Sequence, residues 1–294
     1  MSVGRPMLRK RLVAGTLLAA AVGVVLLLDG HTAPNYPALF TVAMLAGVLC
    51  TRELHGLFAA ASRPGLALTT RGVVAVLAAN WVQPVLAAAG LPAPVSPWHP
   101  VLLAFAGFVV AAFLVEMATY AGPTGGVGRI AHAVLAVAYL GLLPSTFLQL
   151  RWFDPHDSGW LLALVVFVPK CGDIGAYTTG RLVGRTPFAP RLSPKKTWEG
   201  FAGGLALSVG TAISFDTAHP LFRGGWPEAV GFGLAVGTAA VLGDLAESLI
   251  KRESGQKDAA SSVPGFGGVL DVLDSVLFAA PVAYVWVAGN YAIR

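Results

Sequence analysis

Charged residues gather in one stretch of this largely apolar chain, residues 248–274. The stretch holds four acidic and three basic side chains and a glycine-rich turn, and strongly apolar segments flank it. Charge at a membrane boundary costs free energy unless it has a partner or a task. We therefore expect the chemistry of this protein in and around this stretch.

Two pairs of carboxylates frame the stretch at helical spacing. Asp244 and Glu247 lie three residues apart near the end of one apolar segment, and Lys251 follows on the same helix face. Asp271 and Asp274 have the same spacing at the start of the next segment. A salt bridge would explain Glu247 and Lys251, and helix capping would explain one of the later aspartates. Carboxylates together with substrate phosphates are typical Mg²⁺ ligands, so we predict a metal site here.

The residues between these pairs suit an anion. Basic side chains neutralise phosphates, and the backbone N–H groups of a glycine turn at 264–268 can approach an anion closely. Most glycine turns only connect helices, but this one lies between Lys-Asp and Asp-x-x-Asp. The predicted substrate contacts of this segment are Arg252, Lys257, Gly267 and Gly268.

A second polar constellation begins inside an earlier apolar segment. Lys170 and Asp173 lie three residues apart there, and mutual pairing would lower the cost of burying them. A run of hydroxyl and lysine side chains follows at 193–200, just before a helix start, which suits a polyphosphate. The predicted substrate contacts of this run are Ser193, Lys195, Lys196 and Thr197.

The composition is that of a membrane protein. Hydrophobic residues make up 55% of the 294-residue chain and charged residues only 12%, against about 25% charged residues in soluble domains. Crossing the hydrocarbon core takes about 20 apolar residues. The sequence predicts an all-α, polytopic integral membrane helical bundle of about nine transmembrane helices. The expected spans lie near 12–29, 36–50, 72–91, 100–119, 129–150, 159–180, 199–215, 226–250 and 269–288.

The basic residues predict the orientation of these spans. With a cytoplasmic N-terminus, 16 of the 20 Lys and Arg residues fall in cytoplasmic segments. The net charge of +5 is then explained by basic loops and not by a nucleic-acid partner. The apolar run 12–29 is expected to be a retained helix, because no clear small-x-small cleavage site follows it. We expect a multi-pass protein of the cell (inner, cytoplasmic) membrane, with its active site facing the cytoplasm.

Two regions are expected along the chain. Residues 1–160 would form an N-terminal transmembrane scaffold that offers a surface for a homodimer, and residues 161–294 would form a catalytic transmembrane region with cytoplasmic motif loops.

Cys50 and Cys171 have no metal-ligand spacing, and the histidines form no HxxxH or similar set. The sequence therefore predicts no zinc site.

Together these motifs resemble the phosphatidate cytidylyltransferase family, also called CDP-diacylglycerol synthases. The family signature reads Ser-x-x-Lys-Arg, then Lys-Asp, a Pro-Gly-His-Gly-Gly turn and Asp-Arg-x-Asp. The resemblance covers roughly residues 165–280, and the N-terminal half matches only in hydropathy and at Arg52–Glu53. The matching residues are Asp173, Ala176, Tyr177, the run 193–200, Ser248, Lys251, Arg252, Lys257, Asp258, Pro264, Gly265, Gly267, Gly268, Asp271 and Asp274.

The resemblance implies an enzyme of phospholipid biosynthesis, a nucleotidyltransferase that converts CTP and phosphatidate to CDP-diacylglycerol and pyrophosphate. It implies CTP, phosphatidate and membrane lipids as partners and Mg²⁺ as cofactor, and it leaves open whether a monovalent cation joins the Mg²⁺. The catalytic residues would be Asp271, Asp274, Asp244 and Lys251. The metal ligands would be Asp173, Asp244, Asp271 and Asp274.

Two departures from the family pattern leave alternatives open. Phe266 stands where the family usually has His, and Val272 where it usually has Arg. These changes remove two phosphate contacts but no metal ligand, so a catalytically weakened paralogue is one alternative. A CTP-dependent kinase for a lipid alcohol such as polyprenol or phytol is another, and it would release CDP in place of pyrophosphate. A cation transporter is less favoured because it gives no reason for the Ser-Pro-Lys-Lys-Thr run.

Overall fold

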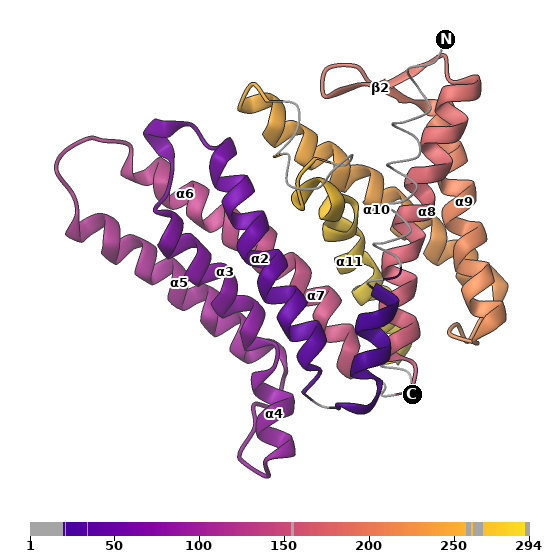
Figure 1. The fold of residues 1–294 in the computed structure, drawn as a ribbon, viewed down its shortest axis with the longest axis horizontal. Coiled ribbons are helices and arrows are strands. Elements are labelled where there is room, and N and C mark those ends of the chain that lie inside the picture. Colours follow the sequence, from indigo (N-terminus) through magenta and orange to yellow (C-terminus); the bar gives the residue numbers. More distant parts are fainter. Residues whose placement is uncertain are drawn as a thin grey trace. The chain divides into compact units, whose positions relative to one another are not determined.

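The computed structural model describes residues 20, 22–33, 35–153, 156–256, 260 and 267–291. Helices predominate among these residues, as the all-α prediction required (Figure 1). The chain divides into two compact units. One comprises residues 1–145 and 258–272, and the other comprises residues 146–257 and 273–294.

The first unit is built around α3 (Leu66–Ala79). This helix packs against α2 (Pro37–Leu57), α5 (Trp98–Ala118), α6 (Gly126–Val137) and the π-helical turn η3 (Ala138–Leu142). Val73, Val76 and Leu77 of α3 are buried in these contacts. Residues 22–28 are also helical, and the shorter elements are the 3-10 turns η1 (Asp29–His31) and η2 (Ala60–Ser62), α4 (Val82–Ala88), and α7 (Leu143–Gln149), which leads into the second unit.

A buried carboxylate fixes the start of α2. The Asp29 side chain, only 1% exposed, accepts the N–H groups of Ala38 at 3.0 Å and Leu39 at 2.7 Å. The first N–H groups of a helix have no acceptor within the helix. Asp29 supplies two of the missing acceptors and so stabilises this end of α2.

The second unit consists mainly of long helices and one hairpin. α8 (Ser158–Val183) packs along α9 (Trp198–Ala218), and both contact α10 (Trp226–Glu253) (Figure 1). α11 (Leu270–Tyr291) begins in the first unit and continues in the second. The smaller elements are the 3-10 turn η4 (Leu150–Trp152) and the strands β1 (Pro187–Ala189) and β2 (Ser193–Thr197), which join α8 to α9.

Glycines allow α8 and α9 to approach closely. A Cβ atom on Gly175 would lie 2.6 Å from the carbonyl oxygen of Gly203, and one on Gly204 would lie 3.1 Å from that of Gly172. Small residues at such contacts let helix backbones meet within a membrane. This contact fixes the position of α8, the helix that carries Asp173.

Six of the described helical segments are long and apolar enough to cross a membrane, which makes this a multi-pass helical membrane protein. They are Pro37–Leu57, Trp98–Ala118, Gly126–Trp152, Ser158–Val183, Trp226–Glu253 and Leu270–Gly289. The pair α3 and α4, bent by 42°, raises the number to seven if it forms one broken span. The expected nine spans are not confirmed. Half of 12–29 lies outside the described residues, and the expected span 199–215 forms α9, which is not among the six.

Candidate active site

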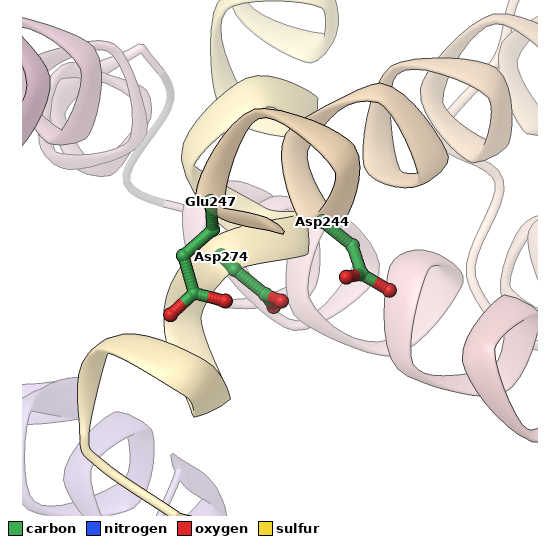
Figure 2. A group of neighbouring side chains, drawn as sticks. All are labelled: Asp244, Glu247 and Asp274. Carbon is green, nitrogen blue, oxygen red and sulfur yellow. The ribbon is translucent and has the colours of Figure 1, made fainter. Parts of the chain in front are cut away.

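Three carboxylates from two helices lie next to one another in the second unit. Asp244 and Glu247 of α10 and Asp274 of α11 each place one oxygen within 4.8 Å of the others (Figure 2). Gly243 permits this approach, because a Cβ there would lie only 2.5 Å from the carbonyl oxygen of Asp274. Glu247 is fully buried and Asp274 is 7% exposed. Carboxylate oxygens grouped in this way fit a hard divalent cation such as Mg²⁺.

Two lysines form ion pairs with the α10 carboxylates. Lys196 of β2 lies 2.7 Å from an Asp244 oxygen, measured from Nζ. Lys251 donates to Glu247 one helical turn away, at 2.5 Å, and both side chains are buried. The second contact is the salt-bridged helix end that the sequence allowed. The catalytic role expected for Lys251 therefore stays a prediction.

A third lysine connects α8 with α11. Lys170 Nζ lies 3.3 Å from an Asp173 oxygen and 3.9 Å from an Asp274 oxygen, and it donates to the Ser275 hydroxyl at 2.7 Å. Ser275 Oγ in turn donates to Asp173 at 3.2 Å. Asp173 and Lys170 do pair, as the simpler interpretation expected, but the pair also extends to the carboxylate of α11.

A pocket of about 530 Å³ lies among α8, the hairpin, α9 and α10, a size typical of small-molecule sites. Its lining brings two acidic residues, Asp173 and Asp244, together with three basic ones, Arg181, Lys195 and Lys196. Two expected metal ligands and two expected phosphate-binding lysines therefore share one pocket. The other lining residues are Ala176, Tyr177, Gly180, Phe188, Thr197, Gly200, Phe201 and Val241.

The sequence did not predict the hairpin that carries these lysines. Pro187 pairs with Thr197, and Ala189 pairs with Ser193, in antiparallel register. Thr197 also caps α9, because its Oγ1 accepts the N–H of Gly200 at 3.1 Å. Ser193 and Thr197 thus have structural contacts that place the lysines between them.

Glu199 fastens the hairpin to α9. Its carboxylate accepts the N–H groups of Arg185 and Thr186, each at 3.2 Å. Its own N–H and then those of Arg185 and Thr186 lower the pKa of Glu199 to about 2. The side chain is therefore charged throughout the physiological pH range and keeps these contacts.

Arg252 contacts backbone oxygens. Its Nε donates to the carbonyl of Leu192 at 3.1 Å, and its Nη1 donates to that of Gln256 at 3.2 Å. It joins the end of α10 to the hairpin turn and is not among the described residues that line the pocket. Its phosphate-binding role stays a prediction. Lys257 and Phe266 lie outside the described residues.

The glycine turn leads into α11 within the first unit. Gly267 has a φ of +106°, which glycine adopts readily. The N–H of Gly268 donates to Oδ2 of Asp271 at 2.6 Å. Asp271 therefore makes the helix-start contact that the sequence offered as the alternative to metal binding. Among the described residues it is not part of the carboxylate group, and its catalytic and metal-binding roles stay predictions.

Sequence reasoning gave no chemical role to Glu53, yet this residue meets the same turn. Its carboxylate accepts the N–H groups of Val269 at 3.0 Å and Leu270 at 2.8 Å. The two partners lie 216 and 217 residues away along the chain. No local spacing signals such a contact.

Arg181 was counted only as loop charge, but it lines the pocket. Its Nη1 donates to the hydroxyl of Tyr177, four residues earlier on α8, at 3.0 Å. The signal that would have found the pair is their i, i+4 spacing at a helix end next to the lysine run.

The fold and the site define a multi-pass membrane protein with buried carboxylates beside a lysine-lined pocket. Such a combination suits a phosphorylated ligand together with a divalent cation. The chain belongs to the cytidylyltransferase family, whose model matches residues 9–289.

The similar proteins of known name are phosphatidate cytidylyltransferases. The phosphatidate cytidylyltransferase of Pseudomonas aeruginosa is 35% identical over 293 residues, covering 96% of this chain and 98% of that protein. That of Haemophilus influenzae is 44% identical over 131 residues, covering 44% of this chain and 46% of that protein. The phosphatidate cytidylyltransferase 5, chloroplastic, of Arabidopsis thaliana is 29% identical over 318 residues, covering 96% and 72%. The chain spans about half the length of several of its curated relatives, those of H. influenzae and Mycobacterium bovis included (46% and 54%).

Proposed function

We propose that this protein is a phosphatidate cytidylyltransferase that converts CTP and phosphatidate to CDP-diacylglycerol and pyrophosphate. The observation that carries the proposal is the pocket in which Asp173 and Asp244 meet Lys195 and Lys196, next to the buried carboxylate of Asp274. Its family and the names of its relatives agree with this activity.

The reaction needs positioning more than proton transfer. A phosphate oxygen of phosphatidate attacks the α-phosphorus of CTP, and the bond from that phosphorus to the oxygen bridging the α- and β-phosphates breaks, so that pyrophosphate leaves. The attacking oxygen is already ionised, so no strong general base is required. Alignment of the two phosphates and neutralisation of their charge then supply most of the rate enhancement.

The acidic residues fit a resident Mg²⁺. Asp244, Glu247 and Asp274 offer oxygens at a spacing suited to one ion, and Asp173 is linked to Asp274 through Lys170. Mg²⁺ bound there would withdraw negative charge from the phosphate oxygens. We propose Asp244 and Asp274 as ligands, with Asp173 beside them.

The basic residues of the pocket bind the phosphates in this proposal. Lys195 is exposed at the pocket, and Lys196 already pairs with Asp244. Arg181 adds a planar guanidinium that can hold two phosphate oxygens at once. These three cations can neutralise most of the charge of a triphosphate.

The test is CTP-dependent turnover of phosphatidate in detergent with Mg²⁺. D274N and D244N should each reduce pyrophosphate release by about 100-fold or more, because each loses a charged metal ligand. D216N is the matched control: Asp216 accepts the N–H groups of Leu221 and Phe222 in the loop after α9, so this variant tests the loss of a carboxylate that has only a structural contact. Parental turnover in both D274N and D244N would refute the assignment.

The released nucleotide separates this activity from its alternatives. Pyrophosphate and CDP-diacylglycerol are expected, whereas a lipid-alcohol kinase would release CDP. A weakened paralogue would bind CTP without either product. Val272, one of the two departures from the family pattern, is buried at 8% exposure and so fills an apolar position.

We further propose that the site faces the cytoplasm from the cell membrane. The basic residues of the hairpin and the α10 end support this orientation through the positive-inside rule. A cysteine at Ser193 should react with an impermeant maleimide in inside-out vesicles and resist it in intact cells. The reverse pattern would overturn the orientation. Homodimer formation is a separate prediction, checked by the mass of the purified protein in detergent.

A further inference from the structure

We propose that Glu53 is a positioning residue for the α11 carboxylates, an inference that rests on the proposed function. Its carboxylate accepts the N–H groups of Val269 and Leu270 and so holds the first turn of α11. Asp271 lies in that turn, and Asp274 follows three residues later on the same unbroken helix. The directions of both side chains depend on how the turn is held.

The geometry of the Glu53 contact restricts rotation of the carboxylate relative to the first turn of α11. Oε1 takes the N–H of Val269 at 3.0 Å, and Oε2 takes that of Leu270 at 2.8 Å. Two separate bonds to two successive N–H groups fix the plane of the carboxylate as well as its position. Glu53 is 7% exposed, so water competes little for these donors. The positive end of the helix dipole also favours a charged acceptor here.

The two positions before α11 must be glycine, because a side chain at either one would collide with a carboxylate. A Cβ on Gly268 would lie 2.5 Å from Oε2 and 2.8 Å from Cδ of Glu53, so a side chain there would displace the carboxylate. A Cβ on Gly267 would lie 2.6 Å from Oδ2 of Asp271. The turn is thus shaped to admit Glu53 on one side and Asp271 on the other, which gives the glycines a role without any direct contact to substrate.

The same helix α2 offers a matched control at its other end. Asp29 accepts two successive N–H groups, those of Ala38 and Leu39, at 3.0 and 2.7 Å. Asp29 is also buried, at 1% exposure. The two carboxylates differ in what the capped helix carries in its first turn, since only α11 begins with a residue expected at the metal site.

The experiment measures Mn²⁺ binding, without nucleotide or lipid, to the full-length protein in detergent by electron paramagnetic resonance. E53Q should bind Mn²⁺ about 10-fold more weakly, because loss of a residue that orients metal ligands commonly has an effect of this size. D29N should keep Mn²⁺ affinity within about twofold while losing a similar cap. The melting temperatures of both variants are measured to check that the two lost caps cost similar stability.

A second pair of variants protects the test against misfolding. G268A leaves Glu53 intact but fills the space its carboxylate occupies, and it should weaken Mn²⁺ binding as E53Q does. E53D keeps the charge on a shorter side chain and should recover part of the affinity lost in E53Q. Parental Mn²⁺ affinity in E53Q or G268A, or an equal loss in D29N, would overturn the inference.

Turnover of the parental protein is measured separately. A parental protein that binds Mn²⁺ but releases no pyrophosphate from CTP and phosphatidate would refute the proposed function. The Mn²⁺ comparison between E53Q and D29N would still decide the role of Glu53.

Discussion

Replacing Gly243 by alanine tests whether the separation of α10 and α11 limits activity. A Cβ at this position would lie 2.5 Å from the carbonyl oxygen of Asp274 and 3.0 Å from Cβ of Phe278. Comfortable contacts of this kind are about 3.5 Å long, so the two helices must separate locally by about 1 Å. A displacement of about 1 Å in a catalytic group can lower turnover about 100-fold, whereas overpacking costs about 1–3 kcal/mol of stability. We expect G243A to fold and to lose about 100-fold in turnover.

The assay is pyrophosphate release from CTP and phosphatidate at saturating Mg²⁺, with thermal melting of the same samples. G210A is the control, because a Cβ on Gly210 of α9 meets nothing within 4 Å. Alanine favours a helix over glycine by about 1 kcal/mol, so G210A should be as stable as the parent or slightly more so, with unchanged turnover. Parental turnover in G243A would refute the view that this helix contact sets the geometry of the carboxylates.

Three further perturbations address the hairpin and its lysines. K196M removes the partner of Asp244 and one pocket charge, and it should lower kcat/KM for CTP by about 10- to 100-fold, since a charged hydrogen bond contributes about 1.5–3 kcal/mol; an unchanged kcat/KM would exclude a phosphate contact. T197V removes the α9 cap and should lower stability by about 1 kcal/mol in thermal melting, while T197S should not. The pKa of Glu199 is lowered from 4.5 to about 2, so its stabilisation of the hairpin is complete above about pH 4.5 and lost as the pH falls towards 2. Proteolysis of the hairpin by pepsin should therefore accelerate, relative to E199Q, between pH 4 and pH 2, and equal acceleration in both proteins would contradict this role.

The local spacing of residues was enough to predict the two apolar helices that carry the carboxylates. Apolar flanks make the segments around Asp244 and Asp274 helical, and a period of 3.6 residues then determines which neighbours share a face. That reasoning anticipated the contact between Glu247 and Lys251, which the structure contains. It also raised the pairing of Lys170 with Asp173.

The spacing of residues along the chain could not predict contacts between segments that are distant in sequence. Lys196 meets Asp244 only because the hairpin packs against α9 and brings β2 to α10. The hairpin sequence contains three prolines between 187 and 194 and few β-branched residues, so strand propensity did not reveal it. Glu53 meets α11 through a contact that closes more than 200 residues of chain.

One of the expected spans is interrupted where a polar residue ends a helix inside an apolar run. The expected span 72–91 is divided at Asn80, which is fully buried. Its side-chain N–H₂ donates to the carbonyl of Leu77 and to the hydroxyl of Ser145. Hydropathy alone cannot detect this, because a buried polar group satisfied by distant partners costs little in a membrane bundle.

The charge balance of the carboxylates and lysines in the second unit indicates that they do more than stabilise the fold. A purely structural cluster is most stable when each buried charge has its own counter-charge, and apolar replacement is often as stable. Here Lys170 is shared between Asp173 and Asp274, so the pairs described leave more carboxylate than ammonium charge. Excess negative charge in a region of low dielectric constant destabilises the fold unless a further cation joins it. In the proposed function the same excess would attract a divalent cation, and phosphate oxygens in the pocket beside it would complete that cation's ligands.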